Sequence, residues 1–139
     1  MIEVAAPSLD QINECWGEIS TLLQKAIDYS NGEIDIDVLH QHVNDGSVMV
    51  AVVFENGNLV AVTTFEQIEF ETGKRVMNIQ LAGGENVESW FEHIEALAYS
   101  LAKRYSCSDV YIIGRKGWVK KMKHLGYSEV HTILHKEVN

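Results

Sequence analysis

Residues 75–92 read RVMNIQLAGGENVESWFE, and this stretch decides the fold. Apolar and polar residues alternate up to a Gly-Gly pair, as in a β-strand, with Met77, Ile79 and Leu81 on one face. The apolar residues that follow recur at helical spacing, so a helix is predicted to begin almost at once. Such a corner directs the backbone N–H groups of a helix N-terminus into one small space, which suits phosphate oxygens. Many strand-to-helix corners use glycine only to make the turn, so both interpretations stay open.

Strands and helices are predicted on both sides of this corner. Alternating or continuous apolar runs predict strands at residues 1–5, 48–54, 59–70, 75–82, 109–113 and 127–138. Asn-Gly at residues 56–57 and Thr-Gly at residues 72–73 predict two hairpins, which join the three middle strands into an antiparallel meander. Apolar residues at helical spacing predict helices at residues 8–29, 35–44, 87–105 and 116–125.

This order of elements predicts an α/β fold with a mixed sheet, in a single domain of residues 1–139. A strand-helix-strand unit follows the meander, so the right-handed crossover rule places strand 109–113 parallel to strand 75–82. The two long helices each carry one apolar stripe, and we expect them on opposite faces of the sheet. Polar residues near Glu66 and Gln67 interrupt the strand 59–70 and suggest a bulge there.

The net charge of −9 is distributed unevenly along the chain. Residues 1–71 carry thirteen acidic side chains and one basic one, whereas residues 72–139 carry seven acidic and ten basic ones. Five of the eleven basic side chains lie between Arg115 and Lys123. This basic segment is either a solvated helix face or an anion site, for a phosphate-bearing cofactor or for nucleic acid. The negative net charge argues against broad binding along a nucleic-acid backbone, which requires many neutralised phosphates.

Membrane and metal signals are weak in the sequence. No apolar run approaches the roughly 18 residues of a membrane span, and the N-terminus does not read as a signal peptide, so we expect a cytoplasmic protein. His40 and His42 would point about 200° apart on a helix. His131 and His135 would share a strand face but lie about 13 Å apart. No metal site is therefore expected.

At this point the chain resembles the GNAT superfamily of acetyl-CoA-dependent N-acyltransferases, whose element order it matches over nearly its whole length. The phosphate loop of that family reads Arg or Gln, two residues, Gly, one residue, then Gly or Ala. The corresponding stretch here is Gln80-Leu81-Ala82-Gly83-Gly84-Glu85. Its first five residues fit the motif, and the sixth, Glu85, does not. A closing helix that ends in Gly-Tyr, preceded by Gly-Arg-Lys-Gly-Trp at residues 114–118, resembles GNAT-like proteins of tailed bacteriophages.

The resemblance implies acetyl-CoA or CoA as co-substrate and an amine of a small molecule or a protein lysine as acceptor. Pantetheine would lie between strands 75–82 and 109–113, which splay apart in the family, and the amine would attack the thioester directly. The diphosphate would lie on amides at the start of the helix 87–105. The residues that this implies for cofactor binding are Ile79, Gln80, Leu81, Ala82, Gly83, Gly84, Glu85, Asn86 and Arg115.

Two departures from the family pattern keep a second function open. Glu85 replaces a small residue where diphosphate would lie, and Met122 stands where the family often has a tyrosine that protonates the leaving thiolate. The alternative is a non-catalytic GNAT-like protein, with a phage structural, assembly or host-interaction role in the host cytoplasm or the virion. A homodimer is compatible with either function.

Two residues are candidates for the base that deprotonates an incoming ammonium. Glu66 lies on the central strand of the meander, near its break, and His93 lies one turn into the helix beside the expected cofactor. Each could equally be a solvated side chain.

Asn78 and Gln80 share the polar face of their strand and could orient the substrate. A further hypothesis is that the acidic region 28–45 selects a cationic acceptor.

Overall fold

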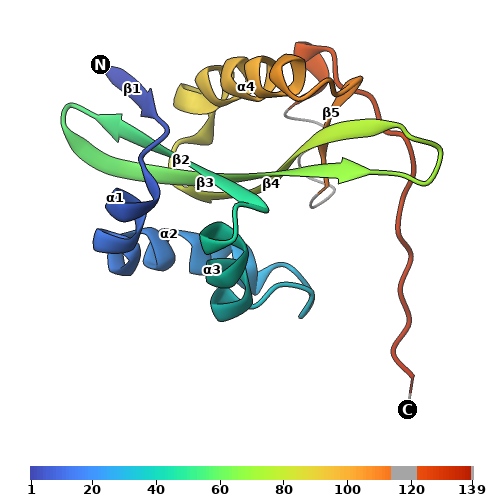
Figure 1. The fold of residues 1–139 in the computed structure, drawn as a ribbon, viewed down its shortest axis with the longest axis horizontal. Helices are drawn as coiled ribbons and strands as arrows, with labels where there is room; N and C mark the ends of the chain where they lie inside the picture. The colour runs from blue at the N-terminus through green and yellow to red at the C-terminus, as the bar shows by residue number, and fades with distance from the viewer. Residues whose placement is uncertain (114–121, 139) are drawn as a thin grey trace.

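The computed structural model describes residues 1–113 and 122–138. It contains one five-stranded sheet in the order β1-β2-β3-β4-β5 (Figure 1). The first four strands pair antiparallel, and β5 pairs parallel to β4, as the crossover rule predicted. The mixed α/β fold with an antiparallel meander is therefore confirmed. The strands are β1 Ile2–Ala5, β2 Val48–Glu55, β3 Asn58–Glu69, β4 Arg75–Gly84 and β5 Asp109–Ile112.

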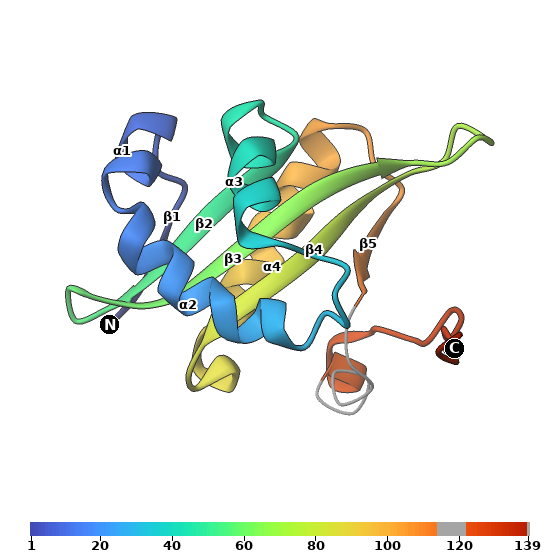
Figure 2. The same ribbon diagram turned by 90° about the horizontal axis from the view of Figure 1, so that it is seen from below.

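Helices cover both faces of this sheet (Figures 1 and 2). On one face lie α1 Leu9–Glu14, α2 Trp16–Asp28 and α3 Ile36–Asn44, and on the other lies α4 Val87–Arg104. The single helix expected at residues 8–29 is two helices, because the backbone at Cys15 has φ −105° and ψ 14°. Gly17, which follows closely, weakens helix propensity at this point. No helix among the described residues is long and apolar enough to cross a membrane.

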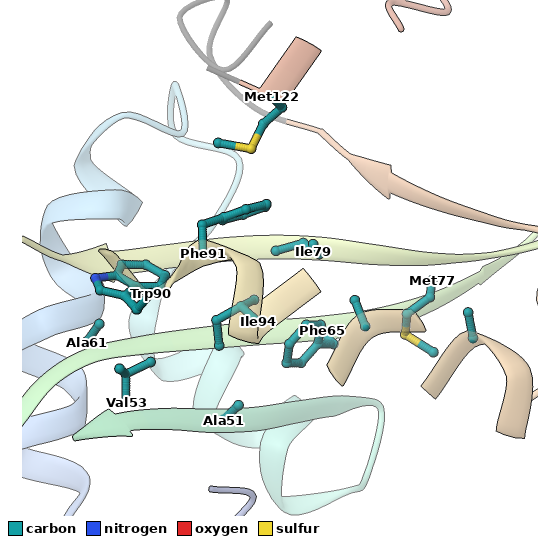
Figure 3. Packing of buried hydrophobic residues seen from close by; sticks show 12 residues of the cluster. Ala51, Val53, Ala61, Phe65, Met77, Ile79, Trp90, Phe91, Ile94 and Met122 are labelled. Atoms are coloured by element: carbon teal, nitrogen blue, oxygen red, sulfur yellow. The ribbon is translucent and has the colours of Figure 1, made fainter. Parts of the chain in front are cut away.

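Each sheet face has its own apolar core. On the α4 side, Phe65, Met77 and Ile79 of the sheet pack with Trp90, Phe91 and Ile94 of α4 (Figure 3). On the other side, the sheet packs against the buried stripes of α2 and α3 through Val50, Val52, Val62 and Leu81. Because side chains alternate along a strand, these two clusters assign the sheet residues to a face wherever no bulge interrupts the strand.

The C-terminal strand expected at residues 127–138 is absent from the described structure. Residues 128–138 are extended but exposed, and they run away from the body of the molecule (Figure 1). A strand exists only where its backbone pairs with a neighbour, and the sequence pattern alone does not supply one. Of the short basic helix expected at 116–125, residues 116–121 lie outside the described residues, and Lys123–Leu125 form a turn of 3₁₀-helix.

Candidate functional site

The neighbouring parallel strands β4 and β5 pair over only part of their length. Pairing runs from Val76 opposite Asp109 to Ile79 opposite Ile112, and there it ends. Strand β4 continues to Gly84 with β3 as its partner on the other side. Among the described residues, nothing pairs with the β5-facing edge of β4 beyond Ile79. The backbone amides of this edge are therefore available to a ligand that can hydrogen-bond like a strand.

A β-bulge lies in β4 at the same place. Thr64 of β3 is opposite Leu81, but the next residue, Phe65, is opposite Ile79, so Gln80 is the extra residue. The bulge expected near Glu66 on β3 therefore lies on the neighbouring strand β4, opposite the step from Thr64 to Phe65. Bulges bend a strand and interrupt its ladder, which accounts for the divergence of β4 from β5.

The bulge also corrects the predicted face of one residue. Strict alternation placed Leu81 with Met77 and Ile79, which pack on the α4 side. Leu81 instead lies in the core beneath α2, because the extra residue Gln80 shifts the alternation by one position.

Polar side chains gather on the α2 face of the sheet, beside the point where the strands separate. Asn78 is only 2% exposed. Its Nδ2 donates to Glu66 Oε1 at 2.9 Å, and its Oδ1 accepts from the backbone N–H of Ile113 at 3.2 Å. Thr64 Oγ1 donates to Gln80 Oε1 at 3.0 Å. The Asn78 side chain thus holds the Glu66 carboxylate and also bonds the first backbone N–H beyond β5.

The two glycines of the expected corner lie inside β4 rather than in the turn. A Cβ atom on Gly83 would overlap the Leu22 carbonyl oxygen of α2 and lie 2.8 Å from its carbon. Gly84 has φ +142°, and a Cβ there would lie 2.5 Å from Val60 O of β3. Both glycines are therefore required by close approach of neighbouring backbone, a role that neither interpretation of the sequence included.

The turn itself consists of Glu85 and Asn86, which are both exposed. Asn86 is the N-cap of α4 in the left-handed conformation (φ 56°, ψ 47°), and its side chain makes no capping hydrogen bond. The indole Nε1 of Trp90 donates to Glu85 O at 2.8 Å and fixes the turn. The N–H of Ser89 donates to Asn86 O at 2.9 Å, and the positive end of the α4 helix dipole lies at this turn, which favours an anion there. Glu85 and Glu88 place two carboxylates beside that position.

The structure brings some of the predicted site residues together and leaves others apart. The β4 residues from Ile79 to Gly84 form the unpaired edge, and Glu85 and Asn86 follow directly. His93 is exposed on α4, across the sheet from Glu66, so the two candidate bases do not share a site. Arg115 lies outside the described residues. Sequence reasoning missed Thr64 and the Trp90 contact; a threonine within an apolar strand was the only available signal.

Met122 and Tyr127 lie on the α4 side of the sheet. Met122 is buried against the cluster that contains Phe91 and Ile79 (Figure 3). Burial, and then the carboxylate of Glu95, raises the pKa of the Tyr127 hydroxyl far above its usual value. Burial also raises the pKa of Glu95, although the two side chains form no hydrogen bond of ordinary geometry. Tyr127 therefore keeps its proton at neutral pH and anchors the chain to α4 before residues 128–138.

No other part of the described chain offers a comparable constellation. Residues 1–113 and 122–138 contain no group of three histidine, cysteine or carboxylate side chains placed to hold a metal ion. The ring of His40 stacks on Trp16 at 3.9 Å, and its Nε2 bonds to Asn13 Oδ1 at 2.6 Å. A groove of about 340 Å³ lies beside the start of β2, away from the β4–β5 divergence, and is lined mainly by apolar side chains such as Ile12, Met49 and Leu101.

Comparison with known proteins supports the architecture. No protein-family model and no curated protein matches the chain. Glucosamine-6-phosphate N-acetyltransferase from Arabidopsis thaliana is similar in structure (TM-score 0.68, 10% identity, 100% of this chain and 99% of that one). So is ribosomal-protein-alanine N-acetyltransferase from Brucella melitensis biovar Abortus 2308 (0.71, 12%, 99% and 99%).

A predicted acetyltransferase from Clostridium acetobutylicum, solved with acetyl-CoA, is similar to the same degree (TM-score 0.71, 15% identity, 99% of this chain and 96% of that one). Identities this low show the fold and not the activity. The likeness nevertheless extends over both chains almost completely in each comparison. The chain has the fold of the GNAT N-acetyltransferases.

Proposed function

We propose that this chain is an acyl-CoA-dependent N-acyltransferase that uses acetyl-CoA or a similar thioester to acylate a primary amine. One observation carries the proposal: β4 leaves β5 at Ile79, at the bulge formed by Gln80. The amide groups of pantetheine would hydrogen-bond to the unpaired β4 edge, and the diphosphate would lie at the first turn of α4. An amide that the bulge releases from the ladder would polarise the thioester carbonyl.

Glu66 is the proposed general base. The acceptor loses a proton to the Glu66 carboxylate, directly or through a water molecule, and becomes a neutral nucleophile. Its nitrogen attacks the carbonyl carbon and the C–N bond forms. The C–S bond breaks with the electron pair on sulfur, and the nitrogen loses its second proton to water or to the departing thiolate, which leaves the neutral amide. Asn78 fixes the carboxylate by its 2.9 Å hydrogen bond. Met122 cannot donate a proton, so the thiolate leaves as an anion or takes a proton from water.

The acceptor is proposed to be a cation. The region 28–45 on the helical face beside Glu66 carries several carboxylates, and it contains no lysine or arginine. Asp35 caps α3, and hydrogen bonds from Ser47 lower the pKa of Asp45. Glu33, Asp37 and Asp28, which also accepts a hydrogen bond from Gln24 Nε2 at 2.9 Å, would attract a charged amine. A panel in which only neutral or anionic amines are acylated would refute this preference.

The first experiment measures ligand binding by thermal unfolding with acetyl-CoA and, separately, with CoA. A ligand at about 100 times its Kd stabilises the folded state by about 2.7 kcal/mol, which is easily detected as a rise in Tm. No shift at millimolar ligand would reject the proposed function. A shift without release of free CoA across the amine panel would favour the alternative, a non-catalytic GNAT-like protein such as a phage assembly factor.

A charge variant locates the binding site. Glu85→Gln removes a carboxylate next to the proposed diphosphate, and we expect about two- to fivefold tighter CoA binding, as for two exposed charges about 5 Å apart. Glu71→Gln is the matched control, because Glu71 is also exposed but lies in the turn between β3 and β4. Equal affinity for both variants and the wild type would place CoA away from the α4 corner.

A further inference from the structure

Two pairs of polar side chains lie next to each other on the α2 face of the sheet. Asn78 Nδ2 donates to Glu66 Oε1 at 2.9 Å, and Thr64 Oγ1 donates to Gln80 Oε1 at 3.0 Å. Each pair joins β3 to β4. Thr64 and Glu66 are two residues apart on β3, so their side chains point to the same face. The pairs differ in how much of the amide group they use.

The amide of Asn78 is used at both ends, whereas the amide of Gln80 is used at one. Asn78 Oδ1 also accepts from the backbone N–H of Ile113 at 3.2 Å, so this side chain is fixed on both sides. The Nε2 group of Gln80 carries two N–H donors and bonds to no residue among 1–113 and 122–138. Gln80 therefore has donors left for a ligand, and Asn78 does not.

Thr64 determines which end of the Gln80 amide is left over. Thr64 is fully buried, and its hydroxyl needs an acceptor because an unpaired polar group in the interior is costly. The oxygen of the Gln80 amide is that acceptor. Gln80 itself is only partly buried, so its Nε2 group can meet a molecule that binds on this face. A buried threonine thus orients a donor beside Glu66.

Gln80 also lies at the proposed reacting centre. It is the extra residue of the bulge, at the place where β4 leaves β5. In the proposed mechanism, a backbone amide released by this bulge polarises the thioester carbonyl. The backbone of Gln80 therefore belongs to the edge proposed for the acyl donor, while its side chain lies on the same face as the proposed base Glu66.

We propose that Gln80 is a specificity-determining residue for the acceptor and that Thr64 is its positioning residue, an inference that rests on the proposed acyltransferase function. Glu66 binds the amine, and Gln80 Nε2 donates to an oxygen of the same molecule. Residues two apart on a strand are separated by about 6.6 Å, and each hydrogen bond spans about 2.9 Å. An amine and an oxygen on neighbouring carbon atoms fit this spacing. The acceptor class is therefore an amine with a hydroxyl or carbonyl oxygen beside it, rather than a plain alkylamine.

The first test compares three small amines, with acetyl-CoA as the donor and thiol release as the measurement. In 2-aminoethanol a hydroxyl and in glycinamide a carbonyl oxygen lies next to the amine, whereas propylamine has a methyl group there. In Gln80→Met, the preference for the better oxygen-bearing amine over propylamine should fall by about five- to tenfold, as expected for the loss of one hydrogen bond. Because this preference is compared between proteins, differences in pKa between the amines cancel. An unchanged preference in Gln80→Met would overturn the proposal.

Gln67→Met is the matched control. Gln67 follows Glu66 on β3 but is exposed on the opposite face, so the preference should stay at the wild-type value. The double variant Thr64→Val/Gln80→Met leaves no hydroxyl unpaired in the interior and should have the same low preference as Gln80→Met.

Variants of Thr64 test its positioning role. Thr64→Val removes the hydroxyl that holds the Gln80 oxygen and should lower the preference, whereas Thr64→Ser keeps that hydroxyl and should retain the preference. A merely structural role of Thr64 would change the rates for all three amines alike, and that result would remove Thr64 from the proposal.

The second test needs no catalysis, so it separates failure of this inference from failure of the proposed function. The side-chain NH2 group of Gln80 gives a pair of signals in a ¹⁵N–¹H correlation spectrum, and their loss in Gln80→Met assigns them. We expect the pair to shift and saturate when 2-aminoethanol or glycinamide is added, with and without CoA and without an acyl donor. Propylamine should move the signals much less.

Signals that stay in place with all three amines, or that move equally with all three, would overturn the proposal whatever the rate assay gives. Signals that respond as expected in a protein that releases no thiol would support the amine site and reject the acyltransferase function.

Discussion

Replacing Gly83 with alanine is expected to lower the free energy of unfolding by about 3 kcal/mol. The added methyl group would overlap the Leu22 carbonyl and lie 3.2 Å from Leu23 Cα, both in the backbone of α2. Backbone cannot turn aside as a flexible side chain can, so α2 must move away from the sheet. Overpacking of this kind typically costs about 1–3 kcal/mol and sometimes more. Urea unfolding followed by circular dichroism measures the change.

Gly17→Ala is the matched control for this substitution. Gly17 lies inside α2, and a Cβ there would meet no atom within 4 Å. Alanine should therefore raise the free energy of unfolding by up to about 1 kcal/mol, since it favours the helix. A Gly83→Ala variant as stable as the wild type would contradict the close contact between the α2 backbone and β4 at this position.

The role of Gly83 changes what the Gly-Gly pair says about function. The sequence offered phosphate binding or a simple turn as reasons for glycine. The structure adds a third, because a helix on one face and a strand beside it leave no room for Cβ atoms. This chain needs both glycines whether or not it binds CoA, so the pair alone does not indicate catalysis.

The strands and hairpins were predictable because their signals are local. Alternation, the Asn-Gly turn and the strand-helix-strand order are contained in short windows, and they place the five strands within about two residues of their observed bounds. The helix break at Cys15 was not predictable, since the apolar stripe continues across it from Ile12 to Ile19. The prediction of the last strand failed for the opposite reason: its sequence pattern is present, but no strand among residues 1–113 and 122–138 pairs with it.

For the candidate site, the sequence predicted which face of a strand a residue lies on, but not which residues it contacts. Alternation placed Asn78 on the polar face of its strand, and Glu66 was a candidate because of its position on the neighbouring strand. The contact that joins them to Ile113 depends on where β5 leaves β4, and that depends on one extra residue, Gln80. A one-residue bulge changes neither composition nor hydrophobicity, so it leaves little signal in the sequence.

Replacing Glu66 with glutamine is expected to lower kcat/KM for the amine by about 10²–10³-fold at neutral pH, while the affinity for CoA stays the same. The amide keeps the size of the side chain and an oxygen that can accept the hydrogen bond from Asn78, but it does not take a proton from an ammonium. General-base help is typically worth about 10²–10⁴-fold, so the expected loss lies in that range. Thiol release from acetyl-CoA measures the rate.

Glu69→Gln separates this effect from a general change of charge. Glu69 lies on the same strand, is exposed, and pairs with Arg75 at 3.4 Å, an ion pair of small expected energy. Its variant should keep wild-type activity. Comparable losses in both variants would mean that charge near β3, rather than proton transfer at Glu66, determines the rate.

The dependence of rate on pH distinguishes a base from a residue that only supports the structure. Without a base, only the acceptor molecules that are already neutral can react. Their fraction rises tenfold per pH unit below the pKa of the amine, which is about 10 for a lysine-like acceptor. The deficit of Glu66→Gln should therefore shrink steadily as the pH rises from 7 to 9. A structural defect would instead lower the rate by a constant factor, and such a constant deficit would remove Glu66 from the proposed mechanism.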